Sequence, residues 1–372
     1  MNLALRQVFG NPSSIHGEGQ RARQCVENAR RSIAAFLEVA PAELVFTSGG
    51  TESNNLAIFG LIKTVPGDRR HAITTGIEHP AVLEPFRQLE REGIAVSYLA
   101  VDKSGAVSVK ELERLLRPET ILVSVMHANN ETGVIQPIAE IAAIIHRLRQ
   151  AGQSIYFHSD GVQALGKSDV TLPQPGVDLY SISAHKIYAP KGTGALIVRK
   201  HIPLRGIQLG GRHERDRRAG TENVPGIVAF ARAIELCALE DPLHLAALRN
   251  LRNRFETQIL SALDEVEVNG TGANRLANTS NLLFRGVSGE ALLIALDVKG
   301  MAVSTGSACS SGAVEPSHVL LAMGRTREEA KSSVRFSFGR YNSDEEADQL
   351  ADAVITCVRR LRKTRVREVQ LV

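Results

Sequence analysis

The first residue whose type and position suggest chemistry is Lys186. It follows an alternating run at 181–183 that is typical of a strand, and it precedes a turn containing Pro190 and Gly192. Open α/β sheets bind ligands at the carboxyl ends of their strands. A lysine that is partly desolvated there has a lowered pKa and can form a Schiff base. Considered alone, such a lysine is more often an exposed surface residue, so the rest of the chain must decide.

A glycine-rich turn separates a predicted strand at 43–47 from a predicted helix at 54–62. It reads Ser48-Gly49-Gly50-Thr51-Glu52-Ser53. Free N–H groups and the dipole at the start of a helix attract anions. Since no GK[ST] follows this turn and it lacks GxGxxG, we interpret Gly50 and Thr51 as a phosphate site for another kind of cofactor. A plain tight turn is the alternative.

Polar residues follow three further predicted strands, at the point where each strand ends. They are His79 after 71–75, Asn130 after 121–126, and Asp160 and Gln163 after 154–158. Parallel strands end at the same edge of a sheet, so we expect these side chains to meet Thr51 and Lys186 there. One strand-end aspartate alone would be interpreted as a helix cap. Because polar residues recur at the ends of several strands, a shared site with a functional Lys186 is favoured.

Two residues of the C-terminal part complete the set. Cys309 lies in a run of small residues, GSACSSG at 306–312. Free cysteine is normally buried, whereas exposed thiols in flexible loops are typical of redox-active sites; an incidental thiol is the alternative. Arg335 begins a predicted strand and can bind a carboxylate through two parallel hydrogen bonds, or it forms a surface ion pair. Together with Lys186, the anion turn and Asp160, these residues predict a pyridoxal-phosphate enzyme that acts on an amino acid with a covalent cysteine step.

The elements that position these residues suggest two domains. Strands alternate with helices over 1–240, which predicts a large α/β domain with a mainly parallel sheet flanked by helices. Asp241-Pro242 begins a new helix, and we place the boundary there. Residues 241–372 are expected to form a smaller α+β domain, with a helix at 289–299 and strands near 265–269, 279–284, 301–304 and 334–338.

Two stretches are expected to lack regular secondary structure. Residues 1–20 show little periodicity. The Arg- and Gly-rich stretch 205–224 is interpreted as a functional loop or as a segment that crosses to another subunit.

Composition limits the classes of partner. The 372 residues have a net charge of +4, which is too small to predict nucleic-acid binding. No apolar run is long enough for a bilayer and no signal peptide is apparent, so no membrane is expected. The four cysteines lack CxxC spacing, which argues against a metal site and favours a reducing cytoplasm. The basic run 359–367 is a helix end, or a docking surface for an acidic protein.

The chain resembles the cysteine desulfurases of the class V aminotransferases, which supply sulfur for iron–sulfur clusters and tRNA thiolation. The resembling stretches occur in the order of the family and cover nearly the whole chain. They are FGNPSS (9–14), FTSGGTESNNLA (46–57), EHPAV (78–82), MHANNETG (126–133), HSDGVQALGK (158–167), SAHKIYAPKG (183–192), RAGTENV (218–224), 304–324 and RFSFGR (335–340). The segment around Cys309 resembles the long-loop branch of the family.

This resemblance implies a PLP-dependent transferase of fold type I that converts L-cysteine to L-alanine. It implies that Lys186 binds the cofactor as a Schiff base, that Asp160 and Gln163 bond the ring nitrogen and ring hydroxyl, and that His79 stacks on the ring. It assigns the phosphate to Thr51, Ser183 and His185, with Thr221 from the partner subunit of a homodimer. Asn130 and Arg335 would bind the substrate carboxylate. Cys309 would take the sulfur as a persulfide and pass it to an iron–sulfur scaffold or sulfur-carrier protein.

The chain departs from the family in three places. It lacks the strand and the Ala-Thr-Thr-Pro stretch that usually precede FGNPSS, it has Asp160-Gly161 where Asp-Ala is more frequent, and its C-terminal docking segment is short. The alternatives are a selenocysteine lyase or another class V enzyme, and a weakened partner subunit that binds a sulfur-acceptor protein. Cys309 favours the desulfurase, since a transaminase has no use for such a thiol.

Overall fold

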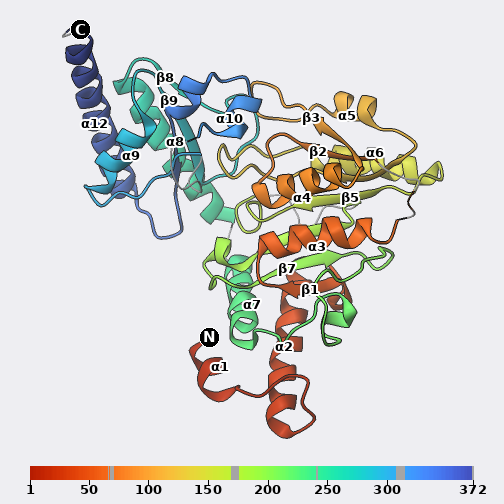
Figure 1. The fold of residues 1–372 in the computed structure, drawn as a ribbon. Helices are drawn as coiled ribbons and strands as arrows, with labels where there is room; N and C mark the ends of the chain where they lie inside the picture. The colour runs from red at the N-terminus through yellow and green to blue at the C-terminus, as the bar shows by residue number, and fades with distance from the viewer. Residues whose placement is uncertain (66, 68–70, 169–175, 240–241, 307–314, 371–372) are drawn as a thin grey trace. The chain divides into compact units, whose positions relative to one another are not determined.

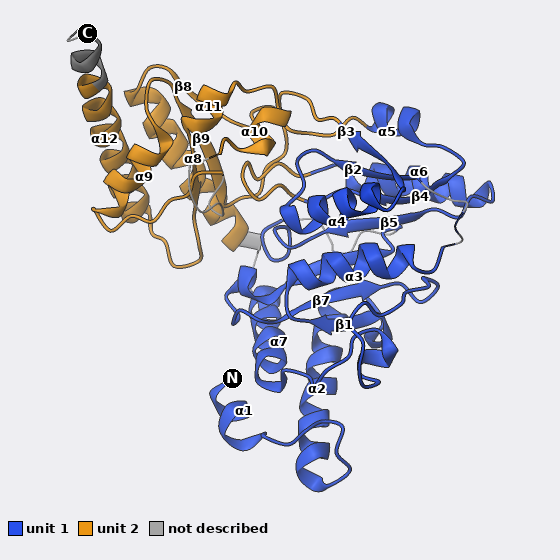
Figure 2. Ribbon diagram, viewed as in Figure 1, with its two compact units in different colours: residues 1–99, 109–127, 136–241 blue, residues 100–108, 128–135, 242–372 orange. Residues whose placement is uncertain are grey.

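The computed structural model of the protein describes residues 1–65, 67, 71–168, 176–239, 242–306 and 315–370, with only the backbone of 242–243 and 365–370. They form two compact units (Figure 2). The first contains residues 1–99, 109–127 and 136–241, and the second contains 100–108, 128–135 and 242–372. The division predicted from the sequence at residue 240 places 100–108 and 128–135 in the first domain. The structure assigns both stretches, and with them Asn130, to the second unit.

The first unit is built on a seven-stranded sheet in the order β1-β7-β6-β5-β4-β2-β3 (Figure 1). The strands are β1 (Leu44–Thr47), β2 (His71–Thr75), β3 (Ala95–Leu99), β4 (Thr120–Ser124), β5 (Tyr156–Asp160), β6 (Leu179–Ser183) and β7 (Gly194–Val198). Six of them run in one direction, and β7 pairs antiparallel with both β1 and β6. The mainly parallel α/β sheet predicted from the sequence is confirmed.

The first unit also contains helices, several of which contact strands of the sheet. The helices are α1 (Asn2–Gln7), α2 (Gly17–Phe36), α3 (Gly50–Ile62), α4 (Pro80–Arg91), α5 (Val109–Leu115), α6 (Ile138–Gln150) and α7 (Val224–Leu239), with short 3₁₀ turns η1 (Pro41–Glu43), η2 (Ala184–Ile187) and η3 (Glu214–Asp216). Strands β2, β4, β6 and β7 are buried at every residue, as expected for strands covered on both faces. The prediction that residues 1–20 lack regular structure is wrong for α1, a helix of six residues whose local pattern is too short to detect.

The second unit is an α+β fold around an antiparallel sheet in the order β10-β9-β8. Its elements are α8 (Pro242–Ala262), β8 (Val266–Val268), β9 (Thr279–Phe284), α9 (Gly289–Asp297), α10 (His318–Ala322), α11 (Arg327–Lys331), β10 (Ser333–Ser337) and α12 (Asp344–Gln370). Phe255 of α8 packs on Phe336 with ring centroids 4.8 Å apart. The expected strand at 301–304 is reduced to a single bridge between Ser304 and Arg335.

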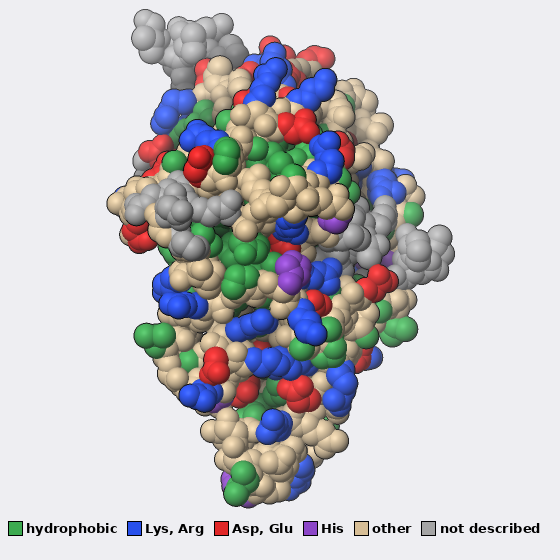
Figure 3. Space-filling model, turned by 90° about the vertical axis from the view of Figure 1, so that its right-hand side faces the viewer, with side chains coloured by type: hydrophobic (Ala, Val, Ile, Leu, Met, Phe, Trp, Pro, Cys, Tyr) green, Lys and Arg blue, Asp and Glu red, His purple; other side chains and the backbone are tan. Residues whose placement is uncertain are grey.

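The described surface agrees with a globular protein of small net charge. No helix in the described part of the chain is long and apolar enough to cross a membrane. On the face drawn in Figure 3, Lys and Arg side chains are interspersed with Asp and Glu.

Candidate active site

The carboxyl ends of four strands of the first unit lead into the predicted site residues. Strand β1 leads to Gly50 and Thr51 in the first turn of α3, and β2 leads to His79, the N-cap of α4. Strand β5 ends at Asp160, and β6 leads through Ser183 into η2, which contains His185 and Lys186. Because β1, β2, β4, β5 and β6 run in the same direction, these residues lie along one edge of the sheet, as the alternating pattern predicted.

Asp160 is the buried acid of this edge. Its Oδ2 accepts a hydrogen bond from Asn54 Nδ2 at 2.7 Å, and its Oδ1 accepts one from the backbone N–H of Val162 at 2.9 Å. Burial raises the pKa of Asp160, while these bonds and the nearby charges of His79 and Lys186 act in the opposite direction. The structure therefore brings Asp160, His79 and Lys186 together from three different strand ends.

Asn54 is a site residue that the sequence interpretation missed. Its side chain is buried, and its Oδ1 has no hydrogen-bond partner among the described residues. Buried polar atoms in native proteins are almost always bonded, so an orphaned acceptor beside Asp160 indicates room for a donor from a ligand. The signal in the sequence was its position in the first turns of the helix that follows the glycine-rich turn.

His79 is held in a defined protonation pattern. It is exposed, and its Nδ1 accepts a hydrogen bond from the backbone N–H of Ala81 at 3.0 Å. A neutral imidazole that accepts at Nδ1 has its proton on Nε2. In this tautomer the ring can donate a hydrogen bond through Nε2.

A cluster of positive charge surrounds His185. Its Nδ1 lies 2.9 Å from Ser183 Oγ. Burial lowers the pKa of His185, and the charges of Lys186, Lys191 and Lys167 lower it further. Ser183 also adjoins the glycine-rich turn, because a Cβ on Gly49 would lie 3.8 Å from Ser183 Oγ. Three lysines, the Ser183 hydroxyl and the start of α3 with Thr51 therefore lie near one another, where a dianion could bind.

The loop that precedes α7 is anchored to the same helix. Arg218 pairs with Glu52 of α3 at 2.9 Å, and Glu52 also accepts from the backbone N–H of Ser48. Thr221, three residues after Arg218, is exposed. Gln163 accepts a hydrogen bond from Lys167 Nζ at 3.1 Å, so its predicted bond to a ring hydroxyl stays a prediction.

The predicted carboxylate-binding pair lies in the second unit. Arg335 Nη1 donates to the backbone carbonyl of Asn130 at 2.7 Å, and burial lowers the pKa of Arg335. Its Nε is buried without a hydrogen-bond partner among the described residues. Arg335 is thus not a surface ion pair. Cys309 lies outside the described residues, so its predicted role is not tested.

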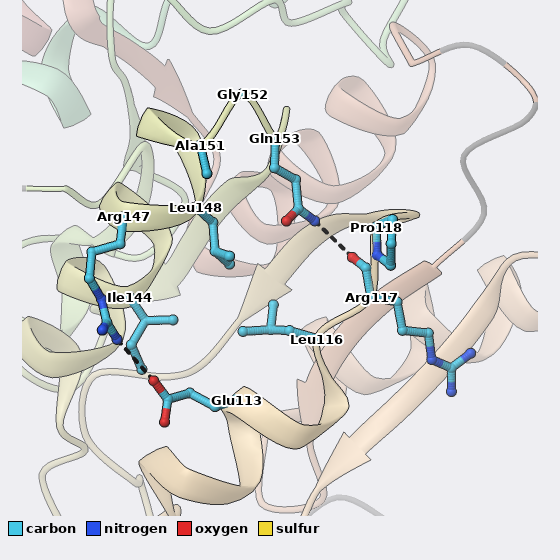
Figure 4. A pocket seen from close by; sticks show the side chains of 10 residues that line it. All are labelled: Glu113, Leu116, Arg117, Pro118, Ile144, Arg147, Leu148, Ala151, Gly152 and Gln153. Atoms are coloured by element: carbon cyan, nitrogen blue, oxygen red, sulfur yellow. Dashed lines mark hydrogen bonds and ion pairs between the residues drawn. The ribbon is translucent and has the colours of Figure 1, made fainter.

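Two cavities of the first unit differ in their lining, and only one of the two is lined by predicted site residues. A cavity of about 510 Å³ is lined by Thr51 and His79 at the starts of α3 and α4. A larger one, of about 670 Å³, lies between α5 and α6 (Figure 4), where Arg147 pairs with Glu113 at 2.9 Å and Gln153 donates to the carbonyl of Arg117. None of the predicted site residues lines the larger cavity, so we place the chemistry at the strand-end edge.

Known proteins that resemble the chain were compared over its whole length. The family model described as aminotransferase class-V matches residues 1–350. A protein named cysteine desulfurase IscS from Dictyoglomus turgidum is 45% identical over 362 residues, which are 97% of this chain and 91% of that protein. A solved structure described as a NifS-like protein has a TM-score of 0.88 and 37% identity, covering 95% of this chain and 93% of that one. The structure of SspA in complex with cysteine has a TM-score of 0.79 and 33% identity, covering 92% and 94%.

Proposed function

Since the chain belongs to the class-V aminotransferase family, and within it to the cysteine desulfurases, we propose that it converts L-cysteine to L-alanine and keeps the sulfur as a persulfide on Cys309. The observation that supports this most directly is the buried Asp160 beside Lys186 and His79 at the strand-end edge. The related structure with cysteine bound supports the same substrate.

The residues of the strand-end edge fit pyridoxal phosphate. Lys186 provides a primary amine, Asp160 a buried carboxylate for a protonated ring nitrogen, and the start of α3 with the lysines around His185 a place for the phosphate. The orphaned Oδ1 of Asn54 adds an acceptor beside Asp160. When bound, pyridoxal phosphate supplies an electron-withdrawing ring conjugated with the amino group of the substrate.

Each side chain then has one task. Lys186 would hold the cofactor through its amine and would move the proton of the substrate α-carbon. Asp160 would bond the ring nitrogen, since a cation there would offset the burial of the carboxylate charge. His79 would lie against the ring and relay protons. Gln163 bonds the ring hydroxyl, and the phosphate is held by Gly50, Thr51, Ser183 and His185.

The second unit supplies the groups that bind and cleave the substrate. Arg335 and Asn130 bind the substrate carboxylate, and the Nε of Arg335 has no partner among the described residues. The Cys309 thiolate attacks the substrate sulfur, so that an S–S bond forms while the Cβ–S bond of the substrate breaks. The electron pair of the broken bond stays with the substrate carbon, which is protonated and leaves as alanine. The enzyme retains a persulfide, and no external oxidant is required.

A second copy of the chain completes the molecule in this proposal. Large apolar side chains of the first unit are exposed, and they include Leu3, Phe9, Ile15 and Leu209, of which Ile15 is 93% and Leu209 90% exposed. A contiguous partner surface would remove them from water. Thr221 would contact the phosphate of the partner subunit. The persulfide would serve an iron–sulfur scaffold or a sulfur carrier in the cytoplasm.

The test is the Cys309→Ser variant of the purified holoenzyme. The cofactor absorbance and its change on addition of L-cysteine should persist, because Lys186, Asp160 and Arg335 remain. Release of alanine and sulfide in the presence of dithiothreitol should fall to background, since a hydroxyl is a far weaker nucleophile than a thiolate. Borohydride reduction and peptide mapping should place the pyridoxyl group on Lys186.

The matched control is Cys25→Ser, which removes a thiol from helix α2 and should retain full sulfide release. Sulfide release by Cys309→Ser at the normal rate would contradict the assignment of the nucleophile. A pyridoxyl group on Lys191 would contradict the assignment of the cofactor lysine.

A further inference from the structure

The second unit contains a buried carboxyl, Glu131, to which neither the sequence interpretation nor the proposed mechanism assigns a role. Its side chain is 2% exposed. Its backbone is fixed on both sides: the N–H donates to Asn129 Oδ1 at 2.9 Å, and the carbonyl accepts from Asn281 Nδ2 of β9 at 3.1 Å. Because its backbone is fixed, the Glu131 carboxyl can hold in place the residues that its oxygens contact.

The oxygens of Glu131 contact two residues that lie far apart in number from it. Ser317 Oγ donates to Glu131 Oε2 at 2.5 Å, and Ser317 is also the N-cap of α10, where its Oγ accepts from the backbone N–H of Leu320. Gly306 packs directly on the same carboxyl. A Cβ on Gly306 would lie 2.4 Å from Glu131 Oε2 and 2.6 Å from Ser317 Cβ, so only glycine fits between them.

Gly306 and Ser317 stand on either side of residues 307–314, the stretch that contains Cys309. The segment that precedes residue 307 also pairs with β10, the strand that contains Arg335. Ser304 and Arg335 exchange backbone hydrogen bonds at 3.1 and 2.7 Å. Arg335 in turn bonds the carbonyl of Asn130, the neighbour of Glu131. The described residues on both sides of 307–314 thus meet at Glu131, next to the arginine proposed to bind the substrate carboxylate.

The charge of Glu131 fits this location. Burial raises the pKa of Glu131 to about 7, while the Ser317 hydrogen bond and the charge of Arg335 act in the opposite direction. A carboxyl that faces Arg335 without a direct ion pair leaves that arginine able to bind another carboxylate. The hydrogen bond from Ser317 persists in both protonation states, because a protonated carboxyl still has an acceptor oxygen.

We propose that Glu131 is a positioning residue for the sulfur-transfer step, because it joins Gly306 and Ser317 beside Arg335. The inference rests on the proposed desulfurase function, and it assigns Glu131 to the transfer of sulfur to Cys309 and not to the binding of cysteine. Removal of the anchor should therefore slow transfer while the substrate-binding groups stay in place.

The experiment compares the holoenzyme with Glu131→Ala, Glu131→Gln and Arg335→Ala. Glu131→Ala should lower kcat for alanine formation at least tenfold and change KM less than threefold, whereas Arg335→Ala should mainly raise KM. Glu131→Gln retains an acceptor oxygen for Ser317 and should recover most of the kcat. In Glu131→Ala, hydrogen exchange should increase in peptides that cover 302–306 and 315–321.

The control is Glu256→Gln, which weakens another buried ion pair of the same unit, to Arg275 at 2.7 Å, and should leave kcat unchanged. Normal kcat with normal exchange in Glu131→Ala would overturn the proposal, as would an equal loss of kcat in Glu256→Gln or in Glu131→Gln.

The exchange measurement uses no substrate. If the wild-type protein neither changes its cofactor spectrum with cysteine nor forms alanine, the desulfurase proposal fails, and exchange alone then decides whether Glu131 anchors the two sides.

Discussion

Buried carboxyls are the residue-scale feature that distinguishes this protein. Asp160, Glu78 and Glu131 are all buried, and burial raises the pKa of each. Glu78 immediately precedes His79, and its Oε1 accepts hydrogen bonds from the backbone N–H of Met126 at 2.7 Å and from Thr75 Oγ1 at 3.1 Å. It connects the ends of β2 and β4, so the position of His79 depends on an acid that burial destabilises when it is charged.

This connection predicts a pH-dependent stability for the apoprotein. Burial raises the pKa of Glu78 from 4.5 to about 8. Between these values the folded chain retains a proton that the unfolded chain has lost, so the contribution of Glu78 is complete below pH 4.5 and is lost as the pH rises through about 8. Glu78→Gln retains the acceptor oxygen without the titration. Relative to this variant, the wild type should lose a few kcal/mol of unfolding free energy between pH 5 and pH 8.

Urea unfolding at both pH values measures this difference. Glu131 is present in both proteins, and its pKa responds to burial, Ser317 and Arg335, so its titration cancels in the comparison. Part of the difference reflects the interaction of Glu78 with Asp160. Equal pH dependence in the wild type and in Glu78→Gln would show that the carboxyl is already charged at neutral pH.

At the scale of elements, the end of β5 is shaped by its neighbour β6. Gly161 follows Asp160, and a Cβ there would lie only 1.9 Å from Cζ of Tyr180. Tyr180 is fully buried, and its hydroxyl lies 2.9 Å from His127 Nδ1 at the end of β4. The large aromatic ring of Tyr180 explains why this chain has glycine directly after Asp160. The ring fills the space that the methyl group would need.

Gly161→Ala should therefore destabilise the protein by roughly 1–3 kcal/mol, because overpacking forces the Tyr180 ring out of its place. Tyr180→Leu also destabilises, since it leaves a cavity and removes the partner of His127. The double variant should be more stable than the sum of the single effects predicts, with a coupling of about 1 kcal/mol or more. Urea unfolding of all four proteins measures the cycle, and strictly additive effects would show that the two residues do not compete for space.

At the scale of the whole molecule, the loop before α7 combines backbone strain with a buried anchor. Glu214, Arg215 and Asp216 have positive φ values of 45°, 57° and 64°, an unfavourable conformation for three successive residues with side chains. The buried ion pair between Arg30 and Glu214, at 2.6 Å, holds the loop, and Glu214 also accepts from the backbone N–H of Phe46. A strained loop that is anchored this well is suited to contact a second subunit.

We expect the purified protein to be a homodimer with twice the 40.3 kDa mass of the chain. Replacing Ile15 and Leu209 together by Asp should shift the protein toward monomer, because charges would be buried against an apolar partner surface. Tyr341→Asp, at a residue of the second unit that is 83% exposed, is the control and should remain dimeric. Light scattering measures the mass. A stable wild-type monomer that binds pyridoxal phosphate would refute the dimer.

The sequence alone determined the alternation of strands and helices and the strand ends at which Thr51, His79, Asp160 and Lys186 lie. These features depend on local periodicity and turn residues, which are readable along the chain. It did not reveal α1, whose pattern is too short, and it placed a strand at 301–304 where only Ser304 pairs.

Only the tertiary structure decided which distant residues meet. It assigned 128–135 to the second unit, through the contact of Asn130 with Arg335 and of Glu131 with Ser317. It also identified Asn54 and Glu131 as buried polar groups and explained Gly161 through Tyr180. The physical reason is that burial and hydrogen bonding arise between residues that lie up to 205 positions apart in the chain, and such pairing leaves no periodic signal in either segment.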